Sequence, residues 1–130
     1  MDKTQYPRVD YLIIIIIILE NKMSNTRIYK DVYYGWKAIT LLPVPQLSDK
    51  TYLEVVTMKR SSGALCTSCL IQKESTEGYL SHTMFRDFSK AIYKAKVRCT
   101  EKAVREQHEL ALQNIETTIA EAVAHYNKGE

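Results

Sequence analysis

Glycine and proline are distributed very unevenly along this chain of 130 residues. Pro43, Pro45, Gly63 and Gly78 punctuate its middle, whereas neither residue type occurs anywhere from position 79 to 128. Because glycine and proline are the residues that most often reverse the chain, the middle part can turn repeatedly and the later part cannot. The distribution predicts short strands joined by turns, followed by a helical region.

Several segments before position 86 have the composition and the alternation of strands. Gly35 interrupts a stretch rich in aromatic and β-branched residues, where it marks a bulge or a turn. The segment 43–50 is a loop, because its two prolines cannot serve a central ladder. Turns that carry glycine separate the later strands, as in an antiparallel meander. The expected strands are 28–42, 51–60, 64–73 and 79–85, in a sheet of three to five strands between 28 and 85.

Residues 87–127 consist mainly of helix formers, with Asp87 as an N-cap and Gly129 as a stop. A single helix of this length would extend about 60 Å at 1.5 Å per residue, which is more than a small sheet covers. The helix therefore either breaks near Thr100, a second candidate N-cap, or protrudes and pairs with another chain. The fold class is α+β, an antiparallel sheet followed by one long or two C-terminal helices. Two apolar faces support the helix, the first formed by Phe88, Ile92, Ala95 and Cys99 and the second by Val104, His108, Leu112, Ile115, Ile119, Val123 and Tyr126.

Six consecutive isoleucines occupy positions 13–18, inside an apolar run too short to span a membrane. β-Branched residues favour a strand, and an extra or edge strand at 11–19 is one interpretation. The alternative that we favour is a translated leader or poorly anchored tail over 1–22, with the native chain starting at Met23. A membrane-related segment is the third. Residues 23–130 then form a single α+β domain, which is an ordinary size for one domain.

Neither the cysteines nor the histidines form a recognisable reactive centre. Cys66 and Cys69 are spaced like half of a zinc site, but residues three apart on a strand point to opposite faces. Position 112 is Leu, so His108-Glu109 does not begin a zinc-protease motif. We therefore expect no enzymatic activity, no catalytic residue, no metal and no cofactor, and three reduced thiols in a cytoplasmic protein.

Charge is segregated along the C-terminal region. Residues 86–105 hold seven basic and two acidic side chains, and 106–130 hold five acidic and one basic. On a helix, Lys94, Arg98 and Arg105 would lie close together, where they could neutralise phosphates or steer an acidic protein. A solvated face is the simpler interpretation. An antiparallel homodimer through helix 100–126 would place the basic half of one helix beside the acidic half of its mate.

Aromatic residues gather earlier, and Lys59-Arg60 forms a basic hairpin tip. Tyr29, Tyr33, Tyr34, Trp36 and Tyr52 could stack on bases or form an interface, although such residues more often simply pack on a sheet. The candidate binding residues are Lys59, Arg60, Arg86, Lys90, Lys94, Arg98, Lys102, Arg105, Tyr34 and Trp36.

The expected order of three strands (51–60, 64–73, 79–85) and then a helix from 87 resembles the small DNA-binding sheets of integrase arm-type and AP2-like domains. The size and mild charge also resemble phage or plasmid anti-defence proteins, including anti-CRISPR inhibitors. The leading hypothesis is a mobile-element inhibitor that docks on a host protein or nucleoprotein complex, with no membrane partner. Two alternatives are nucleic-acid binding through the sheet and the basic helix 86–105, and capture of a small phosphorylated nucleotide at a helical dimer interface.

Overall fold

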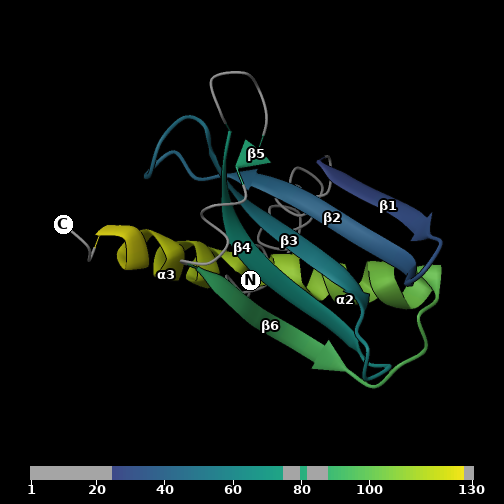
Figure 1. Ribbon diagram of the computed structural model, residues 1–130. Coiled ribbons are helices and arrows are strands. Elements are labelled where there is room, and N and C mark those ends of the chain that lie inside the picture. Colours follow the sequence, from purple (N-terminus) through teal and green to yellow (C-terminus); the bar gives the residue numbers. More distant parts are fainter. Residues whose placement is uncertain (1–24, 75–79, 82–87, 128–130) are drawn as a thin grey trace, which may run out of the picture.

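The computed structural model describes residues 25–74, 80–81 and 88–127. An antiparallel sheet lies in front of two helices, which cover one of its faces (Figure 1). The α+β class, with a sheet followed by two C-terminal helices, is confirmed. The predictions about residues 1–22 lie outside the described part of the chain. Among the described residues, neither helix is long and apolar enough to cross a membrane.

The expected strand 28–42 is a hairpin of two strands, β1 (Thr26–Asp31) and β2 (Gly35–Pro43). Gly35 is the turn residue, with a φ of 78° that L-residues seldom adopt. The carboxylate of Asp31 accepts hydrogen bonds from the backbone N–H groups of Tyr33, at 2.8 Å, and Tyr34, at 3.1 Å. These bonds close the three-residue turn, which we call the hairpin tip (Val32–Tyr34).

The central hairpin agrees closely with the prediction from alternating side chains. Strand β3 (Thr51–Lys59) pairs with β4 (Leu65–Glu74) in continuous register over the length of β3, from Thr51 opposite Lys73 to Lys59 opposite Leu65. Gly63, with a φ of 88°, supplies the turn between them. The loop between β2 and β3 begins one residue later than predicted, because Pro43 is the last residue of β2 and lies opposite Tyr52.

The helix expected from Asp87 is wrong for all the described residues before Glu101. Residues Ser89–Ala95 form strand β6, which pairs antiparallel with β4 from Leu65 to Leu70. The short β5 (Leu80–Ser81) pairs with the other end of β4. β4 is a buried strand that needs partners along its full length, and this tertiary demand overrides the helical propensity of the Lys- and Ala-rich segment. Asp87 lies outside the described residues.

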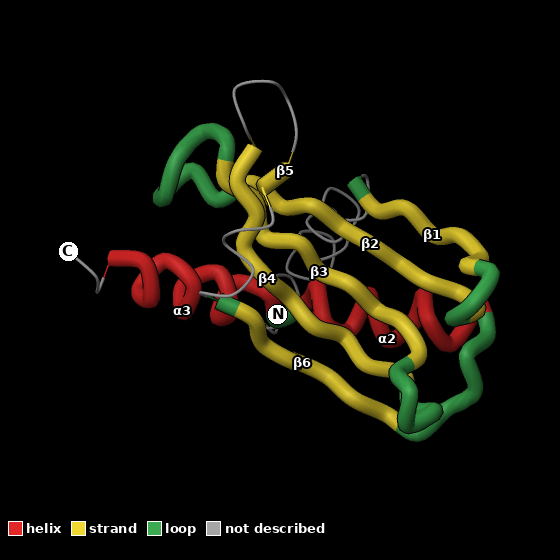
Figure 2. The backbone as a smooth tube through the Cα atoms, viewed as in Figure 1, coloured by secondary structure: helices red, strands yellow, loops and turns green. Residues whose placement is uncertain are grey.

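Helix α2 (Glu101–Gln113) begins at the predicted N-cap, where the Thr100 hydroxyl accepts a hydrogen bond from the N–H of Ala103 at 3.1 Å. The chain leaves the helical path at Asn114, and α3 (Ile115–Asn127) follows directly. The two helices run along the back of the sheet (Figure 2). The break at Asn114 resolves the difficulty of length, because two helices of 13 residues each replace the single helix of about 60 Å.

The core lies between the sheet and the helices and has three parts. Its larger apolar cluster joins the sheet to both helices, and a smaller one forms near the start of α2. Buried threonines and a histidine separate the two clusters. The larger cluster contains Leu42, Val44, Leu53, Val55, Cys69, Ile71, Leu112, Ile115 and Ala122, and the smaller contains Ala38, Leu65 and Val104.

Candidate functional site

The basic residues predicted on one helical face come instead from three different elements. Lys94 lies on β6, Arg98 lies in the linker between β6 and α2, and Arg105 lies on α2. The expectation of a continuous basic helix over 86–105 is therefore wrong, because the chain is extended up to Thr100. Arg86 lies outside the described residues.

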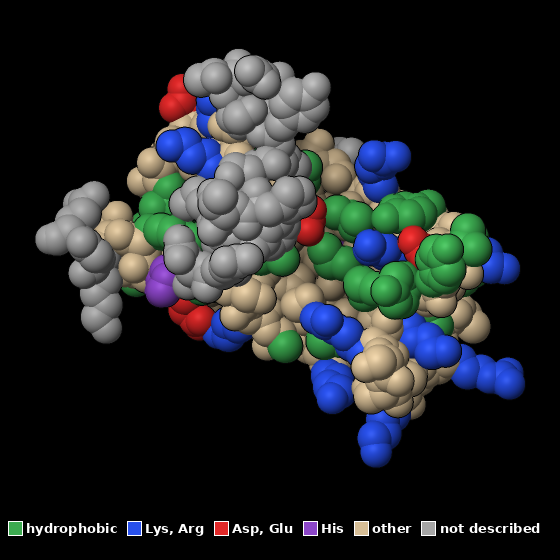
Figure 3. Space-filling model, viewed as in Figure 1, with side chains coloured by type: hydrophobic (Ala, Val, Ile, Leu, Met, Phe, Trp, Pro, Cys, Tyr) green, Lys and Arg blue, Asp and Glu red, His purple; other side chains and the backbone are tan. Residues whose placement is uncertain are grey.

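The antiparallel topology nevertheless gathers several of these cations at one end of the sheet. The β1–β2 turn, the β3–β4 turn and the linker after β6 all lie at this end, because the pairs β1–β2, β2–β3, β3–β4 and β4–β6 are all antiparallel. A hollow of about 600 Å³ is found there. Lysine and arginine side chains gather over this part of the surface, while apolar side chains gather over β1 and β2 (Figure 3). The residues of this basic hollow are Lys59, Ser62, Gly63, Ala64, Lys94, Lys96, Val97, Arg98 and Cys99.

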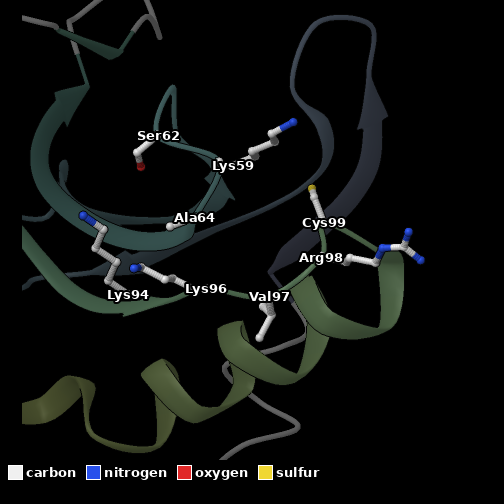
Figure 4. A pocket seen from close by; sticks show the side chains of 9 residues that line it. Lys59, Ser62, Ala64, Lys94, Lys96, Val97, Arg98 and Cys99 are labelled. Atoms are coloured by element: carbon white, nitrogen blue, oxygen red, sulfur yellow. The ribbon is translucent and has the colours of Figure 1, made fainter.

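The basic hollow has two walls that come from distant parts of the chain. Lys59 and Ser62 belong to the β3–β4 hairpin, and the segment from Lys94 to Cys99 faces them (Figure 4). The side chain of Arg98 extends away from the lysines, toward the start of α2 (Figure 4). The cationic side chains thus point in different directions around the hollow (Figure 4).

None of the four cations of the basic hollow has an ion pair with a carboxylate in the described part of the chain, whereas three basic residues outside the hollow do. Elsewhere, Lys90 pairs with Glu121. On α2, Lys102 lies 4.0 Å from Glu106, and Arg105 lies 3.4 Å from Glu101. The unpaired cations are Lys59, Lys94, Lys96 and Arg98, all of them exposed.

Of the remaining predicted residues, Arg60 and Tyr34 are exposed to solvent, and Trp36 is packed. Arg60 donates a hydrogen bond from Nη2 to Ser68 Oγ at 3.1 Å. Tyr34 is about half exposed on the hairpin tip. Trp36 packs instead against the smaller apolar cluster, beside Ala38. Trp36 therefore has a structural role within the described residues, and Tyr34 is left as the accessible aromatic of the pair.

His108 is fully buried and lies between two threonine hydroxyls. Its Nε2 is 2.6 Å from Thr40 Oγ1, and its Nδ1 is 2.7 Å from Thr57 Oγ1. Desolvation lowers the pKa of His108 from 6.5 to about 4, so the ring is neutral at pH 7. A neutral imidazole has one donor and one acceptor, and hydroxyl groups can serve both.

The hydroxyl network continues from His108 in both directions. Thr40 Oγ1 is 2.5 Å from Thr26 Oγ1, and Thr57 Oγ1 is 2.6 Å from Thr67 Oγ1. Gln107 Nε2 donates to Thr67 Oγ1 at 3.2 Å. We call these six residues the threonine–histidine layer. It is enclosed between the sheet and α2, so His108 is placed to stabilise the core and not to meet a substrate.

Cys66 and Cys69 lie on opposite faces of β4, as the strand assignment predicted. Cys69 belongs to the larger apolar cluster, where burial raises the pKa of its thiol to about 11. Cys66 is opposite Met58 and Lys94 in the ladder and is also buried. No group of three or more potential metal ligands comes together within the residues that the structure describes.

Two residues of this end of the molecule were missing from the predicted site. Lys96 had been counted among the basic residues but not among the binding residues, since its place in the hollow depends on the linker after β6. Tyr33 had been grouped only with the other aromatics. The spacing of Asp31 and Gly35 around it was the available signal, because that pattern is typical of a tight hairpin turn.

The expected resemblance to strand–strand–strand–helix DNA-binding domains is weakened by β6, which comes between the third strand and the first helix. Comparison with protein-family models, with curated proteins and with solved structures found no match to this chain.

Proposed function

We propose that this protein is a non-catalytic nucleic-acid-binding protein that holds a phosphate backbone in the basic hollow. The observation that carries the proposal is that Lys59, Lys94, Lys96 and Arg98 line one hollow without an ion-paired carboxylate among the described residues. Lysine and arginine attract phosphates by charge and release the counterions bound to them, which provides most of the affinity in sequence-independent binding.

The geometry favours this function over capture of a small phosphorylated ligand. A site for a single phosphate group needs donors that converge on one point, whereas the cations here extend in different directions around the hollow. The dimer interface proposed for such a ligand was helical, and the hollow is formed mostly by a hairpin and a linker.

An inhibitor that docks on a host nucleoprotein complex, the leading hypothesis from the sequence, is compatible with the same surface. A nucleoprotein complex presents phosphates, and an acidic protein presents carboxylates. The two kinds of partner are separated by direct binding of naked oligonucleotide, which an inhibitor specific for protein carboxylates would not show.

The test is fluorescence anisotropy of a labelled oligonucleotide, measured at several salt concentrations. Lys94→Glu combined with Lys96→Glu should weaken binding by about tenfold or more at low salt. It should also reduce the slope of log K against log salt by about 1.4, at about 0.7 per lost phosphate contact on a single strand.

The matched control is Lys50→Glu combined with Lys73→Glu, at the opposite end of the sheet. Both double variants change the net charge from +3 to −1, since +3 − 4 = −1. A general charge effect would weaken both equally, which would contradict a site in the basic hollow. Absence of oligonucleotide binding by the wild-type protein at low salt would overturn the proposal itself.

A further inference from the structure

The hairpin tip exposes apolar side chains to an unusual degree. Val32 is 93% exposed and Tyr33 is 89% exposed, although both are large and apolar. Single exposed apolar residues are common on protein surfaces. Here three occur in succession, since Tyr34 is also exposed, and all three lie on a turn that projects from the end of the sheet.

The hairpin tip is also held in place by bonds from three directions. The carboxylate of Asp31 accepts hydrogen bonds from the backbone N–H groups of Tyr33 and Tyr34, and Gly35, which has a positive φ, completes the turn. From the other side, the Cys99 thiol donates to the carbonyl oxygen of Trp36 at 3.3 Å and lies 3.6 Å from that of Tyr34. An aromatic side chain on such a support loses little entropy when it binds a partner.

Cys99 connects the hairpin tip to the basic hollow, because its side chain lines that hollow and touches the backbone of the tip. The two hairpins are neighbours in the sheet, in the order β1-β2-β3-β4. Their turns are therefore separated by two strand spacings, or about 10 Å. The hairpin tip and the basic hollow thus lie at the same end of the molecule.

We propose that the nucleic acid bound by this protein is single-stranded, with a base stacked on Tyr33 while the adjoining phosphates lie in the basic hollow. The inference rests on the proposed function and specifies its ligand. A basic groove bordered by an aromatic side chain is the arrangement that binds single strands, because each unpaired base offers a flat face. In a duplex the bases are stacked on one another, and only the phosphates remain for the lysines.

The experiment compares an oligonucleotide of about 12 nucleotides with its duplex, by anisotropy at low salt. The wild-type protein should bind the single strand more tightly than the duplex. Tyr33→Ala should weaken binding of the single strand by roughly 5- to 150-fold and leave duplex binding unchanged. Tyr33→Phe, which keeps the ring and removes the hydroxyl, should bind like wild type.

The salt dependence separates stacking from charge. Tyr33→Ala removes no charge, so it should lower the affinity without changing the slope of log K against log salt, unlike the Lys94→Glu and Lys96→Glu pair. Because Tyr33 is exposed, the variant should keep the wild-type circular dichroism spectrum and melting temperature.

Three outcomes would overturn the inference. Equal affinity for strand and duplex, with Tyr33→Ala binding like wild type, would leave phosphate contact standing and exclude stacking. Equal losses in Tyr33→Ala and Tyr33→Phe would assign the effect to the hydroxyl. A protein that binds neither oligonucleotide would overturn both this inference and the proposed function.

Discussion

The threonine–histidine layer and the basic hollow are both polar, but the layer lies between the sheet and α2, whereas the hollow lies at the surface. In the layer, each nitrogen of the buried His108 ring has a hydroxyl partner within 2.7 Å. In the hollow, Lys59, Lys94, Lys96 and Arg98 are exposed and have no carboxylate partner among the described residues. Every hydroxyl and both ring nitrogens of the layer have a partner within it, although the buried Oε1 of Gln107 has none among the described residues, whereas the cations of the hollow face solvent.

This difference indicates which polar groups stabilise the fold. Two of the elements that contribute to the layer show a polar side chain between apolar neighbours. Thr40 lies between Ala38 and Leu42 on β2, and His108 lies one turn from Val104 and one turn from Leu112 on α2. A buried polar group without a partner destabilises the fold, so the layer also fixes the register of the helix against the strands.

The largest expected effect comes from removing the centre of the layer. His108→Ala should destabilise the protein by about 3–4 kcal/mol, because it leaves a cavity and two buried hydroxyls without their partner. Urea denaturation monitored by circular dichroism would measure it. The matched control is His125→Ala on the exposed side of α3, which should cost under about 1 kcal/mol. Similar losses in the two variants would contradict a structural role for the layer.

Lowering the pH should reduce the stability of the fold through His108 in the layer, and not through the exposed cations of the hollow. The folded pKa of His108, about 4, lies below the value of 6.5 for an unburied histidine, so the unfolded chain binds more protons between these values. Stability should therefore fall as the pH drops from 6.5 to 4, by about 3 kcal/mol at 1.36 kcal/mol per unit.

Carboxylates titrate in part of the same range, so the informative quantity is a difference. Urea denaturation at each pH should show a steeper acid loss for wild type than for His108→Gln, which has no titrating ring. Parallel pH profiles for the two proteins would show that the ring is not held neutral by the fold.

A smaller effect is expected at the support of the hairpin tip. An alanine Cβ at Gly35 would lie 3.3 Å from Cys99 Sγ at a φ of 78°, whereas one at Gly63 would meet nothing within 4 Å at a φ of 88°. Gly63→Ala should cost about 1 kcal/mol from backbone strain alone, and Gly35→Ala about 2 kcal/mol. When both substitutions are measured by denaturation in a Cys99→Ala background, their losses of stability should become equal. If the difference between the two losses is unchanged, contact with the thiol is not its cause.

The smallest effect on stability is expected in the basic hollow. Lys94→Gln combined with Lys96→Gln should change the free energy of unfolding by less than about 0.5 kcal/mol, because neither lysine has an ion pair with a described residue to lose. Lys90→Gln, which removes the pair with Glu121, should destabilise by up to about 1 kcal/mol. A marked loss in the double variant, measured by thermal denaturation, would mean that these lysines support the fold.

Much of the fold follows from local patterns. Alternation over 51–60 and 64–73 predicts β3 and β4 to within one residue at each end, and Thr100 predicts the start of α2. The error at β6 has a clear cause. Lys90, Ala91, Lys94 and Ala95 favour a helix when they are considered alone, and only the unpaired side of β4 makes the segment a strand.

Three of the candidate binding residues share one hollow, although the helical geometry expected for them is wrong. Lys59, Lys94 and Arg98 were named from charge alone, and they do line one hollow. The helical wheel that grouped Lys94 with Arg105 does not apply, because Lys94 lies on a strand. Arg105 instead lies 3.4 Å from Glu101, one turn away on the same helix.

Turn residues, strand alternation and helix caps can be read from the printed sequence because each depends on neighbours two to four positions apart. The gathering of 32–34, 59–64 and 94–99 at one end of the sheet depends on which strand edges pair, and those partners are far apart in the chain. A charge pattern therefore identifies candidate residues. Only the folded chain brings these residues to one surface. The reason is that the pairing of β6 with β4 depends on the burial of β4, and not on the helical propensity of the segment that forms β6.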